Sequence, residues 1–315
     1  MQFNLTQKNY LAIIYSIYTI YGVCLKMERP KKRDLFSKNI SIILSLTKDR
    51  TFTTTQLTKF CKELREKGLV AQRFSHYNLV TELSMYLAKH ITIEIDDDFQ
   101  SIFSYDKAIS VDRMLLGFKK NSFYSMSSAL HKLGVSEFRR EFIFISQELS
   151  KKNVVRVENL SQDAIDSAFR KDYRRTHKIG KYKEKHLVFL YPKNTDSFEV
   201  ITQKDGVRHS SINRAFVEMI VNVQYFKDSL HIIDTFKPLK SKLDPDTVFE
   251  VVKRFDFIYP YFQCVGFYLE QIGFNKSELE KFKSKVGELK FYTDKKKDSY
   301  LYDEYWKIYY IQKIH

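Results

Sequence analysis

The chain has 315 residues, of which 43% are hydrophobic and few are glycine or proline, and its net charge is +15. This composition provides a substantial core and excludes a largely disordered, collagen-like or low-complexity protein. The length suggests two domains, and the basic charge suggests nucleic acid, an anionic membrane surface or an acidic protein as partner, unless it only reflects a lysine-rich proteome.

The first 26 residues form an apolar extension. Its central stretch, YLAIIYSIYTIYGVCL at 10–25, is apolar for 16 residues and contains four tyrosines. A membrane-spanning helix needs about 20 apolar residues, and a signal peptide needs a small-residue cleavage site that is not evident here. Three interpretations remain: a helix that packs on the protein itself, a weak membrane anchor, or an extension upstream of a true start at Met27. The first and third are favoured.

Residues 27–110 are expected to form a DNA-binding domain. Apolar residues at helical spacing predict helices over 35–46 and over 51–68, the second with Cys61 facing the core and Gly68 at its end. Ser75 is expected to cap a third helix whose buried stripe is Leu79, Leu83 and Leu87. Two alternating segments, 91–95 and 101–105, then predict a strand pair. Three helices followed by a two-stranded ribbon is the order of a winged helix-turn-helix.

Charge divides this domain into two parts. Residues 28–90 hold 13 basic and 6 acidic residues, whereas 91–118 hold 2 basic and 6 acidic. The expected wing tip, 96–98, is Asp-Asp-Asp and would repel phosphate, which favours DNA binding through the third helix and the basic arm RPKKR. The candidate base-reading residues are Arg73, Ser75, His76, Tyr77 and Asn78, and the candidate phosphate contacts are Lys31, Lys32 and Arg33. The alternative is that this unit only packs against another protein.

Residues 111–315 are expected to form a second, mixed α+β domain. Its most basic stretch is 170–185, with 8 basic and 2 acidic residues interleaved with two tyrosines. Such a stretch suits nucleic acid or an acidic protein face, and the alternative is a solvated loop edge. The candidate residues of this basic surface are Arg170, Lys171, Arg174, Arg175 and Lys178.

The sequence contains little that points to catalysis. The three cysteines are far apart and have no metal-ligand spacing, and glycine-rich phosphate loops, GxSxG and HExxH motifs do not occur. We therefore expect no cofactor, no metal site and reduced thiols in a cytoplasmic protein. One chance-like match remains: Asp246, Glu288 and Lys290 follow the PD…ExK order of metal-dependent nucleases. Asp246, however, is expected in the first turn of a helix that Asp244 caps.

The aromatic stretch YPYFQCVGFYLEQIGF at 259–274 raises the question of a reactive cysteine. Phe262, Val265, Gly266 and Leu269 recur at helical spacing, and Gly273 can end a helix. We therefore predict a core helix in which Cys264 is a packed thiol.

Five segments together resemble one known family. They are YSMSSALHKLG at 124–134, LSQDAIDSAFRK at 160–171, DGVRHSSINRAFVEMI at 205–220, the 259–274 stretch and WKIYY at 306–310. Their order resembles the AbiEi family, antitoxins of abortive-infection, type IV toxin–antitoxin systems, over about residues 36–310. The chain departs from the family at Phe262, where a histidine is usual, and at 213–218, where the family has an ERTLID-like run. There Arg214 is kept and Glu218 is a similar acid.

The resemblance implies an α+β protein with an N-terminal winged helix-turn-helix and a C-terminal antitoxin domain. It implies a non-enzymatic repressor that binds double-stranded DNA at its own promoter, as a monomer or weak dimer. It also implies that the chain counteracts a nucleotidyltransferase-like toxin, directly or indirectly. The two rival hypotheses are a divergent metal-dependent nuclease and a membrane-tethered defence component.

Overall fold

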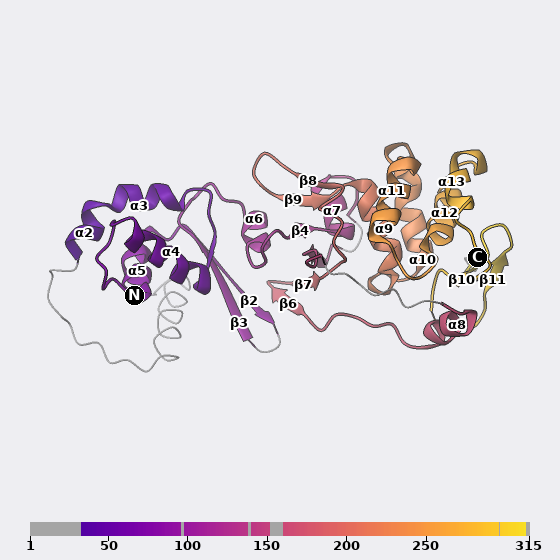
Figure 1. Cartoon of the computed structure of the whole chain (residues 1–315), viewed down its shortest axis with the longest axis horizontal. Helices are drawn as coiled ribbons and strands as arrows, with labels where there is room; N and C mark the ends of the chain where they lie inside the picture. The colour runs from indigo at the N-terminus through magenta and orange to yellow at the C-terminus, as the bar shows by residue number, and fades with distance from the viewer. Residues whose placement is uncertain (1–32, 96–97, 138–139, 152–159, 296, 313–315) are drawn as a thin grey trace, which may run out of the picture.

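The computed structural model describes residues 33–95, 98–137, 140–151, 160–295 and 297–312, which form a mixed α+β fold. The molecule is elongated, with one helical unit at each end and strands between them (Figure 1). The apolar extension, Lys31, Lys32 and residues 96–97 of the predicted wing tip lie outside the described residues.

The N-terminal helical unit contains four helices. They are α2 (Arg33–Lys38), α3 (Ile40–Thr47), α4 (Thr54–Glu66) and α5 (His76–Leu83). The predicted first helix is thus two short helices separated at Asn39. In α4 the buried side chains are Leu57, Phe60, Cys61 and Leu64, which confirms the predicted stripe.

The third predicted helix is shorter than expected. α5 ends at Leu83, and a single 3₁₀ turn, η2 (Ser84–Tyr86), leads to the next strand, which begins at Lys89. Leu87 therefore lies beyond the helix, and the prediction that it continues the buried stripe of Leu79 and Leu83 is wrong. The Ser84 hydroxyl donates to the Thr81 carbonyl at 2.6 Å, a local bond that suits a tightening last turn.

A nine-stranded sheet runs along the molecule in the order β1-β3-β2-β6-β7-β5-β4-β9-β8, and most of its pairs are antiparallel. The strands are β1 (Phe52–Thr53), β2 (Lys89–Ile95), β3 (Asp98–Ser104), β4 (Phe123–Tyr124), β5 (Phe142–Ser146), β6 (Ile179–Tyr182), β7 (Lys185–Leu190), β8 (Val200–Thr202) and β9 (Arg208–Ser210). The predicted hairpin is β2–β3, and the sequence analysis missed β1, which pairs with β3.

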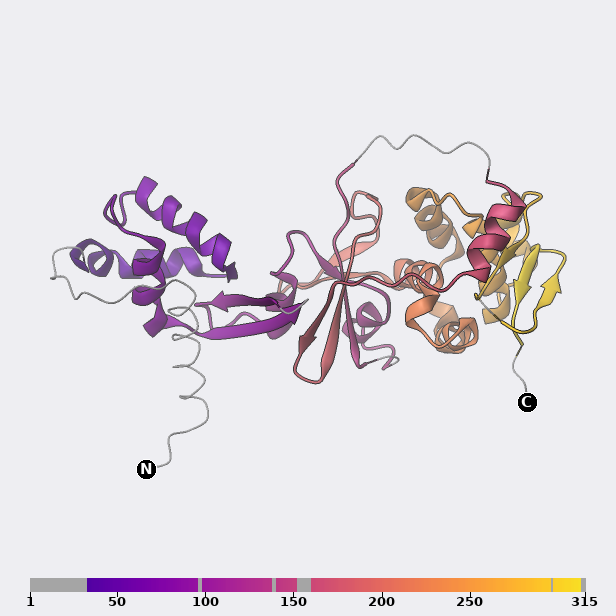
Figure 2. The same cartoon turned by 90° about the horizontal axis from the view of Figure 1, so that it is seen from below.

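The hairpin is joined to the rest of the sheet. Glu94 and Ile95 of β2 pair with Lys181 and Gly180 of β6. Gly180 allows this approach, because a Cβ there would lie 3.1 Å from the Ile95 side chain. One buried cluster contains isoleucines of the hairpin together with Met114 and residues of β7. Sheet and core therefore both cross the predicted domain boundary at 110, and the hairpin points from the helical unit into the middle of the molecule (Figure 2).

The C-terminal part adds further helices and a small sheet. The helices are α6 (Val111–Leu116), α7 (Met126–Lys132), α8 (Gln162–Arg170), α9 (Ile212–Val221), η3 (Val223–Tyr225), α10 (Ser229–Phe236), η4 (Lys237–Lys242), α11 (Pro245–Phe255), α12 (Tyr261–Ile272), η5 (Lys276–Leu279) and α13 (Glu280–Lys283). The small sheet has the order β10-β12-β11, from β10 (Phe291–Tyr292), β11 (Leu301–Asp303) and β12 (Ile308–Tyr310). Ser211 caps α9, and Asp244 caps α11, the latter as predicted.

α12 confirms the prediction of a core helix. Most of its residues from Gln263 to Leu269 are buried, including Cys264 at 2% exposure. Gly266 lets the helix contact the ring of Trp306, because a Cβ at this glycine would lie 2.4 Å from that ring. The Trp306 indole nitrogen also donates to the Glu270 carboxylate of the same helix, which holds the ring in place.

A fully buried arginine on α9 organises the C-terminal part. The Arg214 guanidinium donates to Glu218 at 2.7 Å, to Glu148 at 3.0 Å and to the Thr195 hydroxyl at 2.9 Å. It also donates to the Phe198 carbonyl at 2.6 Å. Isolated buried charges are costly, and this one is both paired and hydrogen-bonded.

The two carboxylates of this network carry further bonds. Glu218 accepts from the Ser210 hydroxyl at 2.8 Å and from the Met126 amide at 3.2 Å, which fixes the start of α7, where Met126 has a φ of 49°. Burial alone would raise the pKa of Glu148, but hydrogen bonds from Thr195 and Ser197 and the Arg214 charge bring its pKa below the usual value. The network thus joins α9, β9, α7 and the segments around 148 and 195.

Arg214→Ala would leave two buried carboxylates without their counter-ion. We expect it to lower the free energy of unfolding by about 3–5 kcal/mol. The measurement is urea denaturation followed by the fluorescence of Trp306, the single tryptophan. The control is Arg140→Ala, since Arg140 pairs with Glu137 on the surface and should contribute about 1 kcal/mol or less. Equal losses in the two variants would contradict the organising role of Arg214.

Gly266→Ala tests the contact between α12 and Trp306. Overpacking a core costs about 1–3 kcal/mol, and we expect this cost to exceed the gain of about 1 kcal/mol in helix propensity. Gly287→Ala is the matched control, because a Cβ at Gly287 meets no atom within 4 Å. Thermal denaturation of both variants measures the difference. A Gly266→Ala protein as stable as the control would show that the contact is loose.

Candidate nucleic-acid interface

The start of α5 is held against the N-terminal core by Phe74. This residue is 4% exposed, and its ring stacks on Phe36 at 5.6 Å. The Phe74 carbonyl accepts a hydrogen bond from the Arg65 guanidinium of α4 at 3.2 Å. Because Phe74 points inward, its neighbour Arg73 lies exposed at the surface.

Two of the predicted base-reading residues form the cap of α5. The Ser75 hydroxyl accepts a hydrogen bond from the backbone N–H of Asn78 at 3.2 Å. In return, the backbone N–H of Ser75 donates to the side-chain oxygen of Asn78 at 3.0 Å. This capping box satisfies amide groups that the first turn of a helix leaves without partners. Ser75 and Asn78 therefore have a structural role at the position where the sequence predicts DNA contacts.

The other three candidates are Arg73, His76 and Tyr77. The rings of His76 and Tyr77 lie 4.4 Å apart in the first turn of α5, and both residues are half-buried. The structure thus brings an exposed cation and two polar aromatic side chains together at one end of this helix. Arg33 begins α2, and its two predicted partners in phosphate binding lie outside the described residues.

The hairpin next to this helix has few cations on its outer face. Thr92 and Ser101 hydroxyls lie 3.0 Å apart, and the His90 ring stacks on Phe103 at 4.8 Å. Phe99, close to the acidic turn, is 73% exposed. Positive charge comes instead from the next strand, because Lys181 of β6 is the cross-strand partner of Glu94.

The five candidates of the basic stretch do not share one surface. Arg170 ends α8 and is exposed. Lys171 and Arg174 line a pocket, together with Lys295. Arg175 instead donates to the Gln224 carbonyl at 3.1 and 2.8 Å, and the Lys178 ammonium lies 5.4 Å from the Tyr191 ring. The sequence analysis missed Lys295, as well as Tyr259 and Tyr261 in the same pocket.

The nuclease-like residues are bound to other partners. Asp246 lies in the first turn of α11 and contacts Lys281, whereas Glu288 contacts Lys307 at 2.9 Å with its own side chain almost fully exposed. The Lys290 ammonium lies 5.1 Å from the Tyr302 ring. Within the described ranges, no group of three or more histidine, cysteine or acidic residues is placed to hold a metal ion.

Cys264 lies in the described core helix α12, whereas the apolar stretch considered as a membrane anchor, residues 10–25, lies outside the described residues. Burial raises the pKa of the Cys264 thiol, which favours the protonated and unreactive form. This agrees with the prediction that Cys264 is a packed thiol.

In the described part of the chain, none of the helices combines the length and apolar character needed to cross a membrane.

Comparisons with known proteins include a likeness to a solved structure. No protein-family model matches the chain, and none of the curated proteins matches it. Among solved structures, it is similar to the crystal structure of the RV2827C protein from Mycobacterium tuberculosis. The two are 12% identical, the match covers 87% of this chain and 91% of the other, and the TM-score is 0.46. We therefore infer the function from this chain's own residues.

Ser75→Ala tests the capping role of this side chain by its effect on stability. Loss of an N-cap hydroxyl usually costs about 1 kcal/mol, so we expect this variant to unfold at lower urea concentration. Arg73→Ala, which removes an exposed side chain two residues away, should change stability by no more than about 0.5 kcal/mol. Circular dichroism during urea titration gives both values. An unchanged midpoint for Ser75→Ala would mean that the cap is dispensable.

Proposed function

We propose that the chain is a non-enzymatic, cytoplasmic DNA-binding regulator that represses its own promoter and acts as the antitoxin of a type IV toxin–antitoxin system. In this proposal residues 27–110 are a winged helix-turn-helix, with α5 as the recognition helix. The partners are double-stranded DNA, bound by a monomer or weak dimer, and a nucleotidyltransferase-like toxin that the chain counteracts directly or indirectly. The toxin part rests on the AbiEi resemblance.

The observation that supports a winged helix best is the short strand β1. Its residues Phe52 and Thr53 pair with Phe103 and Ile102 of β3. The element order is therefore α3-β1-α4-α5-β2-β3, with the sheet order β1-β3-β2. In a winged helix, a short strand before the second helix closes the hairpin into a small three-stranded sheet, and the third helix enters the major groove.

The surface chemistry favours reading by α5 rather than gripping by the hairpin. Arg73 can bond a guanine edge with two hydrogen bonds, and His76 and Tyr77 provide further polar contacts in the same turn. The two strands of the hairpin are connected by the acidic residues 96–97, and the hairpin is paired to β6 at that end. We assign it a supporting role, in which it fixes α5 relative to the rest of the molecule.

In the antitoxin role, Arg214 is a structural residue rather than a contact residue. Arg214, which the resemblance marks as kept, is fully buried and bound by two carboxylates. A side chain in that position acts by shaping the C-terminal part and not by touching a toxin. A residue that contacts a partner must come from the exposed surface, such as Arg170 at the end of α8.

Fluorescence anisotropy of the full chain tests the DNA-binding part. We expect preference for the duplex upstream of its own gene over a scrambled duplex, with affinity that falls steeply as salt rises. Arg73→Ala should weaken binding to the upstream duplex by about 1–3 kcal/mol and leave the scrambled duplex nearly unaffected. Arg140→Ala, an exposed arginine outside residues 27–110, is the matched control.

Two results would overturn this assignment. Equal affinity for both duplexes would leave only non-specific attraction between a basic protein and DNA. Equal loss in Arg73→Ala and Arg140→Ala would remove α5 as the reading helix. The antitoxin part is tested separately, by growth of cells that co-express this chain with a nucleotidyltransferase-like toxin from a neighbouring gene; absence of rescue would reject it.

A further inference from the structure

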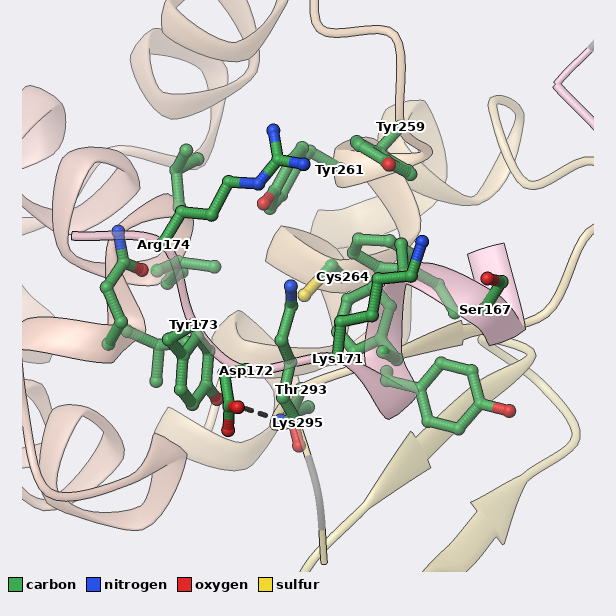
Figure 3. A pocket seen from close by; sticks show the side chains of 18 of the residues that line it. Ser167, Lys171, Asp172, Tyr173, Arg174, Tyr259, Tyr261, Cys264, Thr293 and Lys295 are labelled. Carbon is green, nitrogen blue, oxygen red and sulfur yellow. Dashed lines mark hydrogen bonds between the residues drawn. The ribbon is translucent and has the colours of Figure 1, made fainter. Parts of the chain in front are cut away.

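A pocket of about 630 Å³ lies in the C-terminal part, away from the proposed recognition helix (Figure 3). Its walls come from α8 and the residues that follow it, from the end of α9, from the start of α12 and from β10. Small-molecule sites usually have volumes of about 300–1,000 Å³. The pocket is therefore large enough for a ligand of that kind.

The charges around the pocket are mainly positive. Among the described residues that line it, three are cationic, Lys171, Arg174 and Lys295, and one is acidic, Asp172. Figure 3 shows the side chains of Lys171 and Arg174, from the segment after α8, and of Lys295, from the segment after β10, around the same pocket. Burial lowers the pKa of Lys295, the charges of Arg174 and Lys171 lower it further, and the Asp172 charge partly offsets them. Lys295 therefore lies near two other cations, and a bound anion would favour its charged form.

Aromatic side chains form part of the remaining walls, beside aliphatic residues such as Ile220 and Val221. Tyr173, Tyr259, Tyr261 and Phe169 line the pocket and are half-buried. The Tyr173 hydroxyl accepts a hydrogen bond from the Lys295 amide at 2.8 Å, and the Lys295 ammonium lies 5.6 Å from the rings of both Tyr173 and Phe169. These contacts fix the cationic group beside flat apolar surfaces.

We propose that this pocket binds a nucleoside phosphate, with the phosphate between Arg174, Lys171 and Lys295 and the base against the tyrosine rings. Guanidinium and ammonium groups bind phosphate through charge-assisted hydrogen bonds. Aromatic side chains stack on any base because every base has a π face. A free anion would use only the cations, and an acidic peptide would leave the aromatic walls poorly matched.

The proposal is one of binding only. The thiol of Cys264 lines the pocket, but its raised pKa keeps it protonated. The site uses none of the α5 residues assigned to base reading, and it shares only Lys171 and Arg174 with the predicted basic surface. Its failure would leave the DNA-binding assignment unchanged, and the reverse also holds.

Isothermal titration calorimetry of the full chain is the first test. The probes are AMP and UMP, with inorganic phosphate and the nucleosides adenosine and uridine as partial ligands. We expect at least one nucleotide to bind saturably, at least tenfold more tightly than phosphate and than its own nucleoside. Phosphate binding as tightly as the nucleotide would overturn the proposal, because the aromatic walls would then have no role. Absence of nucleotide binding would overturn it as well.

Variants locate the site. Arg174→Gln and Lys295→Gln should each weaken nucleotide binding at least tenfold, while their melting temperatures stay close to that of the native chain. Lys285→Gln is the matched control, because Lys285 is exposed and does not line the pocket. Native affinity in both pocket variants would overturn the assignment. So would displacement of the nucleotide by a short glutamate-rich peptide at equal concentration, which would point to an acidic protein partner instead.

Discussion

The buried Arg214 network fixes the position of α9, and through α9 it influences segments that do not contact Arg214. Charges in a protein interior must be paired and hydrogen-bonded to be tolerated, so α9 can adopt only the position in which Glu148, Glu218 and the 195–198 segment meet this guanidinium. The chain just beyond α9 then presents the Gln224 carbonyl, which binds Arg175. This bond anchors the basic stretch four residues before β6 begins at Ile179.

From β6 the same chain of contacts reaches the proposed DNA-binding unit. β6 pairs with β2, β2 pairs with β3, and β3 pairs with β1 just before α4. The end of α9 also lines the basic pocket, together with Lys171 and Arg174. One buried ion network therefore positions an element that touches the pocket and, through hydrogen-bonded strands, the hairpin beside α5.

Local signals predicted the local features of this structure well. The cap at Ser75, the α4 stripe, the cap of α11 and the α12 core helix follow from side-chain spacing and capping chemistry. Contacts between distant segments could not be predicted in this way. A two-residue strand such as β1 has no periodicity, and the β2–β6 pairing joins residues far apart in sequence. Lys295 is likewise far along the sequence from Lys171 and Arg174. Nothing in the residues around Arg175 indicated that its side chain would bond the Gln224 carbonyl.

The order of the strands also limits how copies of this protein can associate. The described nine-stranded sheet ends at β1 and β8, which contain two and three residues. Edge strands this short offer few unpaired backbone groups, and the far end of the hairpin, a long element, is already paired to β6. Extension of the sheet from one molecule to the next is therefore disfavoured. Association of two copies is therefore expected to depend on side-chain contacts rather than on backbone pairing at the edges of this sheet.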